Sequence, residues 1–410
     1  MTAEILVMNR SAVALAAQGG LSAGYGPEPA VTRESAKIFP LFEGAPVALM
    51  IYGRADLLGH PWQSLITHYL EASDPPKAKT VADWAAHFFA FLDDNVWMFP
   101  EQDQRSHLEG LLASIFGRII DEAARIYAFP PEERLNELEA LYRAIDLWHE
   151  RYQRDARGER VPALDAFGEA RKESFCERFS SEIESVLESV FGQVRLDAGR
   201  LDKLWDIAFF AVTRNRFYEG CTGLVFAGYG QEELMPAMCS WYVSSIVNYR
   251  MKRALDWEKA ITSRPPQSLV VPFADAPVTN RLMRGLDMAF ENDILRAVEQ
   301  LIGEVGVHMV NGTRELDLPI RKAMKERLFS RLLPEAMSTF QGWMRDYIPE
   351  RSVSPILGSL ESMGADDLAR TARFLIGLNR LGRKDFTLSE STDTAVITRK
   401  EGFTWHNRRA

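Results

Sequence analysis

The sequence predicts an α+β fold in which two mostly antiparallel sheets are covered by helical layers, in the order αββα. Three observations lead to this prediction. Short apolar runs occur in pairs near both ends of the chain, long helical periodicities fill the stretches between them, and the apolar runs are nearly continuous rather than alternating. Continuous runs indicate strands that are buried on both faces, as they are when two sheets pack together beneath outer helices.

The first 53 residues contain two predicted β-hairpins. Apolar residues 5–8 and 12–17 flank a polar link at residues 9–11, and residues 37–42 and 47–53 flank a short turn. Two short apolar runs joined by a tight polar link are typical of a hairpin. Strand character returns later in the chain, at residues 222–230, 234–249, 268–272, 394–398 and 403–407.

Helical periodicity dominates residues 55 to about 200 and again the stretch that begins near residue 279. The first helix ends at Asp74-Pro75-Pro76, because the residue before a proline disfavours helical geometry. The predicted helices are residues 55–73, a helix capped by Thr80, residues 101–127, a helix opened by Pro130-Pro131, and residues 169–191, 279–305, 315–344 with a break near Pro334, and 365–381.

This order divides the chain into four expected segments. Residues 1–75 form the first part of an αββα core, and residues 76–205 form a large helical insertion. Residues 206–312 supply the second part of the core, and residues 313–410 supply a helical layer and the C-terminal hairpin.

Composition and charge exclude several classes of function. The chain has 410 residues and a net charge of −9, from 48 basic and 57 acidic residues, with no basic cluster of the kind that binds nucleic acid. No apolar run reaches the length of a membrane span, and no signal peptide is recognised. Three scattered cysteines favour reduced thiols in the cytoplasm. The seven histidines have no metal-ligand spacing and no phosphate loop is present, so we expect neither metal nor cofactor.

The strand order and four short motifs resemble the N-terminal-nucleophile (Ntn) hydrolases of the proteasome β-subunit and HslV type. In that family a threonine opens the first strand, an acidic residue ends the second, a lysine begins the third and a glycine ends the fourth. Thr2, Lys37 and Gly53 occupy three of these positions. The fourth position holds Gln18, where the family has aspartate. The resemblance is strongest over residues 1–73, 220–285 and 390–407.

The resemblance implies a specific chemistry for these residues. Once Met1 is removed, the hydroxyl of Thr2 is the nucleophile and its free α-amine is the base. The ammonium group of Lys37 assists deprotonation of that hydroxyl, and the backbone N–H of Gly53 donates to the oxyanion. The amide of Gln18 can hydrogen-bond to Lys37 but contributes no charge. Asp275, just after the strand at residues 268–272, is a candidate for the missing carboxylate.

Each of these residues also has an ordinary structural explanation. Thr2 can be the second residue of a chain that keeps Met1, and Lys37 can be a lysine at a strand edge. Gly53 and Gln18 can serve turns. Asp275 can cap the helix that follows it.

We therefore expect a cytoplasmic threonine amidohydrolase or peptidase acting on a peptide or another amide, in a homo-oligomeric assembly. The alternative is a catalytically inactive pseudoenzyme of the same fold that serves as a scaffold or a subunit. A third hypothesis is that the helical insertion binds a protein partner and the core supports it.

Overall fold

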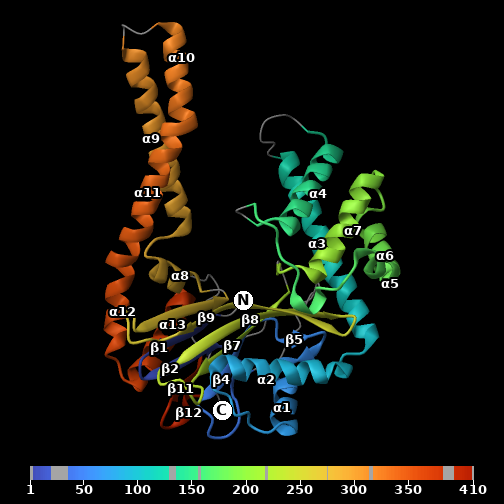
Figure 1. Ribbon diagram of the computed structural model, residues 1–410, viewed down its shortest axis with the longest axis vertical. Coiled ribbons are helices and arrows are strands. Elements are labelled where there is room, and N and C mark those ends of the chain that lie inside the picture. Colours follow the sequence, from blue (N-terminus) through green and yellow to red (C-terminus); the bar gives the residue numbers. More distant parts are fainter. Residues whose placement is uncertain are drawn as a thin grey trace. The chain divides into compact units, whose positions relative to one another are not determined.

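The computed structural model of this protein describes residues 3–19, 36–128, 135–155, 158–217, 220–274, 276–313, 317–381 and 392–408. It is a mixed α+β structure with two five-stranded sheets built from antiparallel pairs (Figure 1). The chain divides into two compact units. Unit 1 contains Gly19–Ala260 and Arg399–Phe403, and unit 2 contains Ala3–Gln18 and Ile261–Thr398.

The first sheet contains both strands of the N-terminal hairpin at its centre. Its strand order is β10 (Ser268–Ala274), β1 (Ala3–Asn9), β2 (Ala12–Gln18), β11 (Thr392–Thr398) and β12 (Gly402–Asn407). Every residue of β1 and β2 is buried, which confirms the prediction from their continuous apolar sequences. The C-terminal hairpin extends this sheet beside β2, as the sequence predicted.

Asn9 fixes the turn of the first hairpin. Its side-chain oxygen accepts hydrogen bonds from the backbone N–H groups of Ser11 (2.9 Å) and Ala12 (3.2 Å). Its amide nitrogen donates to the carbonyls of Leu360 and Met363, both at 2.9 Å. Asparagine suits this position because its short side chain bonds to backbone groups two or three residues away.

The second sheet belongs to unit 1. Its strand order is β3 (Ile38–Pro40), β4 (Val47–Gly53), β7 (Thr222–Gly228), β8 (Ala237–Val247) and β9 (Arg250–Ala260). The hairpin of β3 and β4 confirms the second predicted hairpin.

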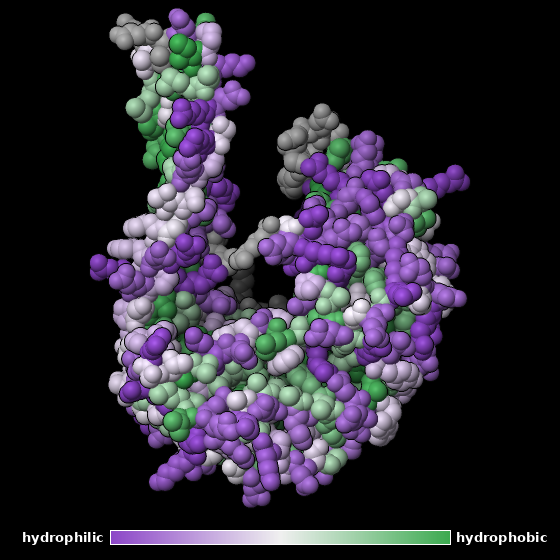
Figure 2. All heavy atoms as spheres, viewed as in Figure 1, coloured by the Kyte–Doolittle hydropathy of each residue, from purple (hydrophilic) through white to green (hydrophobic). Residues whose placement is uncertain are grey.

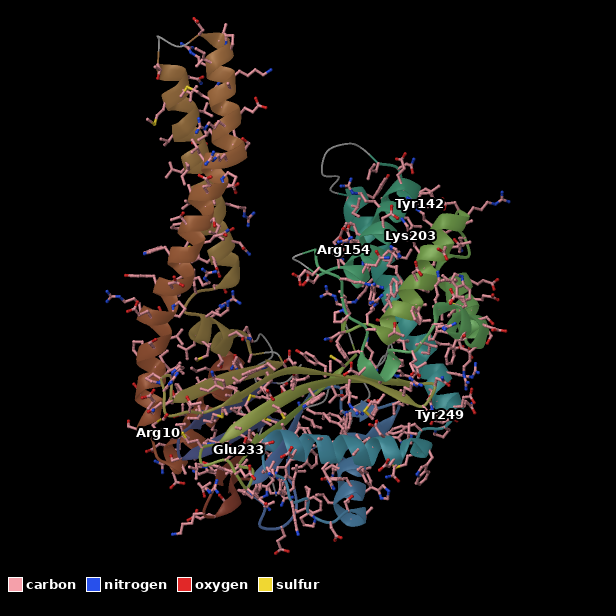
Figure 3. The ribbon with its side chains drawn as sticks, in the orientation of Figure 1. Arg10, Tyr142, Arg154, Lys203, Glu233 and Tyr249 are labelled. Atoms are coloured by element: carbon pink, nitrogen blue, oxygen red, sulfur yellow. The ribbon has the colours of Figure 1, made fainter. Side chains whose placement is uncertain are left out.

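Strand β9 was missed by sequence reasoning, which placed no strand in this charged segment. Asn248 and Tyr249 form the turn between β8 and β9 with positive φ values of 53° and 56°, the geometry of a type I′ hairpin turn. The N–H of Tyr249 (Figure 3) also donates to the side-chain oxygen of Gln104 at 2.9 Å. Pairing with β8 makes this segment a strand despite its charged residues.

Helices fill most of the rest of unit 1. The predicted cap at Thr80 is confirmed, because its hydroxyl accepts from the N–H of Asp83 and Asp83 accepts from the N–H of Thr80. Helix α2 then packs Phe88 and Phe89 against the second sheet. The helices are α1 (Trp62–Ala72), α2 (Val81–Asp94), α3 (Glu101–Ala128), α4 (Glu137–Gln153), α5 (Lys172–Arg178), α6 (Ser180–Phe191) and α7 (Ala198–Thr213).

Two helix predictions in unit 1 were wrong at their boundaries. The helix predicted from Ala55 begins only at Trp62, because β5 (Asp56–Leu57) and β6 (His60–Pro61) form a small hairpin first. The helix predicted over residues 169–191 is divided between α5 and α6 at Phe179, whose ψ of 22° is not helical. The opening Pro130-Pro131 of another predicted helix lies outside the described residues, and α4 begins at Glu137.

Unit 2 adds helices to the first sheet. Helix α13 packs on β1, β2 and β11, with Leu368 and Ala372 against the small side chains of β2. The helices and π-helical turns are α8 (Pro277–Arg284), α9 (Met288–Gly312), α10 (Leu318–Arg327), η3 (Leu328–Leu332), α11 (Leu333–Ile348), η4 (Pro349–Val353), α12 (Ser354–Glu361) and α13 (Ala365–Leu381).

The predicted break near Pro334 was wrong, whereas an unpredicted break occurs at Gly285. Helical residues continue from Leu318 to Glu361 through η3 and η4. The π-helical turn η3 ends immediately before Leu333-Pro334, and its wider hydrogen-bonded ring accommodates a residue without an N–H. Gly285 ends α8 with a left-handed φ of 75°, so the predicted helix over residues 279–305 is two helices.

The two compact units group the chain differently from the four expected segments. Unit 1 combines the second sheet with the helices of residues 76–205, and the expected boundary at residue 205 lies inside α7. Among the described residues, no helix combines the length and the hydrophobicity needed to cross a bilayer.

Candidate functional site

Of the five predicted site positions, Gln18 belongs to the first sheet, and Thr2 and Asp275 are sequence neighbours of residues in that sheet. Gln18 ends β2 and pairs with Thr392 at the start of β11. Ala3 starts β1 and pairs with Ala274, the last residue of β10. Thr2 precedes Ala3 and Asp275 follows Ala274 in the chain, but both lie outside the described residues. Their roles therefore stay predictions.

The side chain of Gln18 belongs to the helix-covered face of this sheet. Side chains alternate along a strand, so Gln18 shares a face with Ala14 and Ala16. These two alanines pack against Leu368 and Ala372 of α13. Gln18 is 3% exposed. The side chain at position 18 is thus a buried, uncharged amide.

Two buried carboxylates on the opposite face were not predicted. Glu4 and Asp393 both pair with Ala17, so the three residues form one row across the sheet. Glu4 is 0% exposed and Asp393 is 7% exposed. Burying a carboxylate is costly unless partners compensate, so such residues often have a specific role. The signal in the sequence was Glu4 itself, an acidic residue at the start of an apolar run and two positions after Thr2.

Lys37 and Gly53 lie at one end of the second sheet. Lys37 is 6% exposed, and its carbonyl accepts a hydrogen bond from the N–H of Ile51 at 2.8 Å. Gly53 ends β4 two residues later, with a left-handed φ of 80°. A Cβ at this position would lie 2.5 Å from the carbonyl oxygen of Cys221. Backbone conformation and close approach therefore both require glycine at position 53.

A set of hydrogen bonds fixes the backbone beside Gly53. The indole N–H of Trp62 donates to the hydroxyl of Thr222 at 2.8 Å, and that hydroxyl donates to the carbonyl of Arg54 at 2.9 Å. The N–H of Arg54 donates to the carbonyl of Cys221 at 3.3 Å. These bonds hold the end of β4 against the start of β7. The position of the Gly53 peptide is thus set by three elements of unit 1.

A second group of polar side chains lies near this strand end. The ring of Tyr52 covers Gly223, where a Cβ would come within 1.9 Å of it. The hydroxyls of Tyr52 and Ser240 are 3.5 Å apart, and the rings of Tyr52 and Tyr242 are 6.4 Å apart. Burial raises the pKa of both tyrosines, and it also raises the pKa of Asp256. Burial therefore disfavours the charged form of each of these three groups.

Lys252, on the unpredicted strand β9, is a fully buried lysine. Its Nζ donates to the carbonyl of Ala211 at 2.6 Å, in the last turn of α7, and to the carbonyl of Arg216 at 2.5 Å. It also lies 4.6 Å from the centre of the Phe217 ring. Burial lowers the pKa of Lys252 to about 7. The bonds to two carbonyls near the end of α7 give this lysine a structural role there.

Comparison with protein-family models and with curated proteins finds no match for this chain. The likeness to Ntn hydrolases therefore rests on the strand order and on the residues at the motif positions.

The helical part of unit 1 contains a separate cavity of about 520 Å³. Its walls include Phe167, Phe175, Phe179 and Val212, and Arg171 also lines it. The volume lies within the range of small-molecule sites. Gln18, Lys37 and Gly53, the predicted site residues that the structure describes, do not line this cavity; residues at the turn between β8 and β9, such as Asn248, do. Among the described residues, no cluster of histidine, cysteine and acidic side chains is suited to hold a metal ion.

Proposed function

We propose that this protein is an N-terminal-threonine amide hydrolase with an Ntn-type αββα core. The observation that supports it best is that a buried Lys37 and the left-handed Gly53 both lie at one end of the second sheet, where Lys37 bonds to Ile51 of the same strand as Gly53. Lysine is almost never fully buried without a specific partner, so Lys37, at 6% exposed, differs from an ordinary exposed lysine at a strand edge.

In this proposal the hydroxyl oxygen of Thr2 adds to the carbonyl carbon of an amide, and the α-amine of Thr2 accepts the hydroxyl proton. The N–H of Gly53 donates to the oxyanion, and the charge of Lys37 favours the deprotonated nucleophile. The C–N bond then breaks as the proton passes to the leaving amine. Water hydrolyses the resulting ester on Thr2 and releases the carboxylic acid. The substrate is a peptide or another amide, and no cofactor takes part.

A specific observation favours the alternative of an inactive protein with the same core. Gln18 is buried on the face that packs against α13 and carries no charge. In this alternative position 18 supplies no negative charge to hold the lysine as the family's aspartate does, and the chain serves as a scaffold or a subunit.

The first experiment measures the intact mass of the purified protein. Loss of Met1 is expected, because methionine before a small residue such as threonine is readily removed. Retention of Met1 in every molecule would exclude the α-amine mechanism.

The second experiment labels the protein with an epoxyketone or β-lactone probe. We expect covalent labelling of wild type that is absent in Thr2→Ala and reduced at least about tenfold in Lys37→Met. The matched control is Lys79→Met, which removes a lysine that is exposed and paired with Glu232. Equal labelling of wild type and Thr2→Ala would refute the enzyme proposal. Labelling that appears only in Gln18→Asp would support the inactive alternative.

A further inference from the structure

Another cavity of unit 1, with a volume of about 280 Å³, is lined mainly by arginines, and we call it the arginine pocket. Its walls are formed by Gln153, Arg154, Arg160, Phe210 and Arg214. Three of these five residues are positively charged and none is acidic. Figure 2 shows that hydrophilic residues cover much of the helical part of unit 1, and Figure 3 labels Arg154. A concave site with this composition attracts anions.

The backbone brings the three arginines together from two parts of the chain. Arg154 directly follows α4, and Arg214 directly follows α7. Arg154 and Arg160 form an antiparallel bridge across the loop after α4, and Ala163 of the same loop forms another with Arg214. These bridges join the loop to the ends of both helices. The positions of the three arginines are therefore set by the fold of unit 1.

Hydrogen bonds to main-chain carbonyls fix two of the three side chains. Nη1 of Arg154 donates to the carbonyl of Gly158 at 2.8 Å, and Nη1 of Arg214 donates to the carbonyl of Val161 at 2.7 Å. The guanidinium of Arg214 also lies 5.0 Å from the centre of the Phe210 ring. A guanidinium has five N–H donors, so these bonds orient both groups and leave further donors for a ligand.

No carboxylate balances the charge of the arginine pocket. In the part of the chain that the structure describes, no acidic side chain forms an ion pair with Arg154, Arg160 or Arg214. Asp206 of α7 is already bonded to His149 of α4, at 2.9 Å. The C-termini of α4 and α7 carry only about half a negative charge each, against three full positive charges. The pocket therefore keeps an excess of positive charge.

Arg214 and Arg160 show the effect of this excess. The Nε of Arg214 is buried and has no hydrogen-bond partner among the described residues, although buried donors are almost always paired. Burial, followed by the charge of Arg160, lowers the pKa of Arg214. The side chain of Arg160 is exposed and makes no hydrogen bond or ion pair within the described residues. Its guanidinium is therefore available to a ligand.

We propose that the arginine pocket binds a phosphate dianion, either free or as the phosphoryl group of a small phosphomonoester. The planar fork of arginine matches the oxygens of phosphate, and a dianion can bond to more than one guanidinium. The volume lies just below the roughly 300–1,000 Å³ of pockets for drug-sized ligands, which suits a small anion. Phe210 gives the pocket one apolar wall. This proposal concerns the ends of α4 and α7 and is independent of the catalytic proposal.

The first test measures binding of inorganic phosphate and of phenyl phosphate to the full-length protein by titration calorimetry. The ionic strength is held constant with potassium chloride, because salt screens exposed charges. Arg160→Gln is expected to weaken binding by about tenfold or more, since it removes a charged donor that makes no bond to the rest of the described chain. Arg160→Lys keeps the charge but not the fork, and is expected to weaken binding less.

The matched control is Arg195→Gln, which removes an exposed arginine before the other end of α7 and is expected to bind as wild type does. Tighter binding of phenyl phosphate than of inorganic phosphate would identify a phosphomonoester as the ligand, and the reverse order would identify free phosphate. No binding of either probe at millimolar concentrations would overturn the proposal. So would an equal loss of affinity in Arg195→Gln, or binding of benzoate, a monoanion, as tight as that of phenyl phosphate.

The second test measures thermal unfolding with and without inorganic phosphate. Without phosphate, Arg160→Gln is expected to unfold at the Tm of wild type or above it, because the substitution removes the repulsion between Arg160 and Arg214. Phosphate is expected to raise the Tm of wild type and of Arg195→Gln more than that of Arg160→Gln, since a ligand stabilises the state that binds it. Equal increases in Tm for wild type and Arg160→Gln would overturn the proposal.

Discussion

Lys252→Met is the substitution with the best-defined effect on stability. The amine of Lys252 is enclosed between β9 and the end of α7, where it donates to the carbonyls of Ala211 and Arg216 at 2.6 and 2.5 Å. Burial lowers its pKa from 10.5 to about 7. A lysine whose folded pKa is depressed makes folding depend on pH, because the unfolded chain keeps the proton that the folded chain loses.

The sign and size of the effect follow from this difference. Between about pH 7 and about pH 10.5 the unfolded state binds more protons, so the free energy of unfolding rises with pH. From about pH 7 to about pH 8.5, Lys252 alone contributes a rise of about 2 kcal/mol. The measurement stops there because Cys239 and Tyr52, whose pKa values are raised by burial, contribute in the opposite direction at higher pH.

The assay is urea unfolding followed by tryptophan fluorescence at several pH values in this window. From about pH 7 to about pH 8.5, the free energy of unfolding of wild type is expected to rise by about 2 kcal/mol more than that of Lys252→Met, which lacks the titrating group. Lys259→Met, on the exposed end of the same strand, is the matched control and is expected to behave as wild type. Identical pH profiles for wild type and Lys252→Met would refute the reasoning and would mean that the two carbonyls keep the buried amine protonated.

Three further substitutions test other parts of the structure. Gly53→Ala is expected to lower the free energy of unfolding in urea by about 2–4 kcal/mol, because the added Cβ meets the Cys221 carbonyl. The control is Gly59→Ala, which has a similar φ of 82° but no atom within 4 Å of the added Cβ. It is expected to lower the free energy of unfolding by about 1 kcal/mol. Equal losses of stability in Gly53→Ala and Gly59→Ala would show that the contact with the Cys221 carbonyl does not contribute. Asn9→Ala is expected to cost about 2–4 kcal/mol in the same assay, since it removes two buried donor bonds to main-chain carbonyls, and a cost below about 1 kcal/mol would contradict this role. Burial, followed by the charge of Arg54, lowers the pKa of His107 to about 4. As the pH falls from about 6.5 to about 4, the free energy of unfolding of wild type is therefore expected to decrease by about 3 kcal/mol relative to that of His107→Gln. Parallel acid-unfolding curves for the two proteins would argue against this.

Gly53 and Lys37 became candidates through their resemblance to motif positions of the Ntn hydrolases. The positive φ of Gly53 agrees with the simpler expectation that this glycine serves a turn. The burial of Glu4, Asp393 and Lys252 could not be predicted in the same way. Each is buried by strands or helices from distant parts of the sequence, as when α7 encloses Lys252 across a separation of 41 residues.

Sequence alone determined the features that depend on neighbouring residues. The first two hairpins, the two-sided burial of β1 and β2, and the cap at Thr80 all follow from patterns a few residues long. Tertiary structure decided the identity of β9, because pairing with β8 overrides the low strand propensity of its charged residues. It also decided that Pro334 does not end its helix, since a π-helical turn before it accommodates the missing N–H. These outcomes depend on pairing and hydrogen-bond geometry that no local pattern encodes.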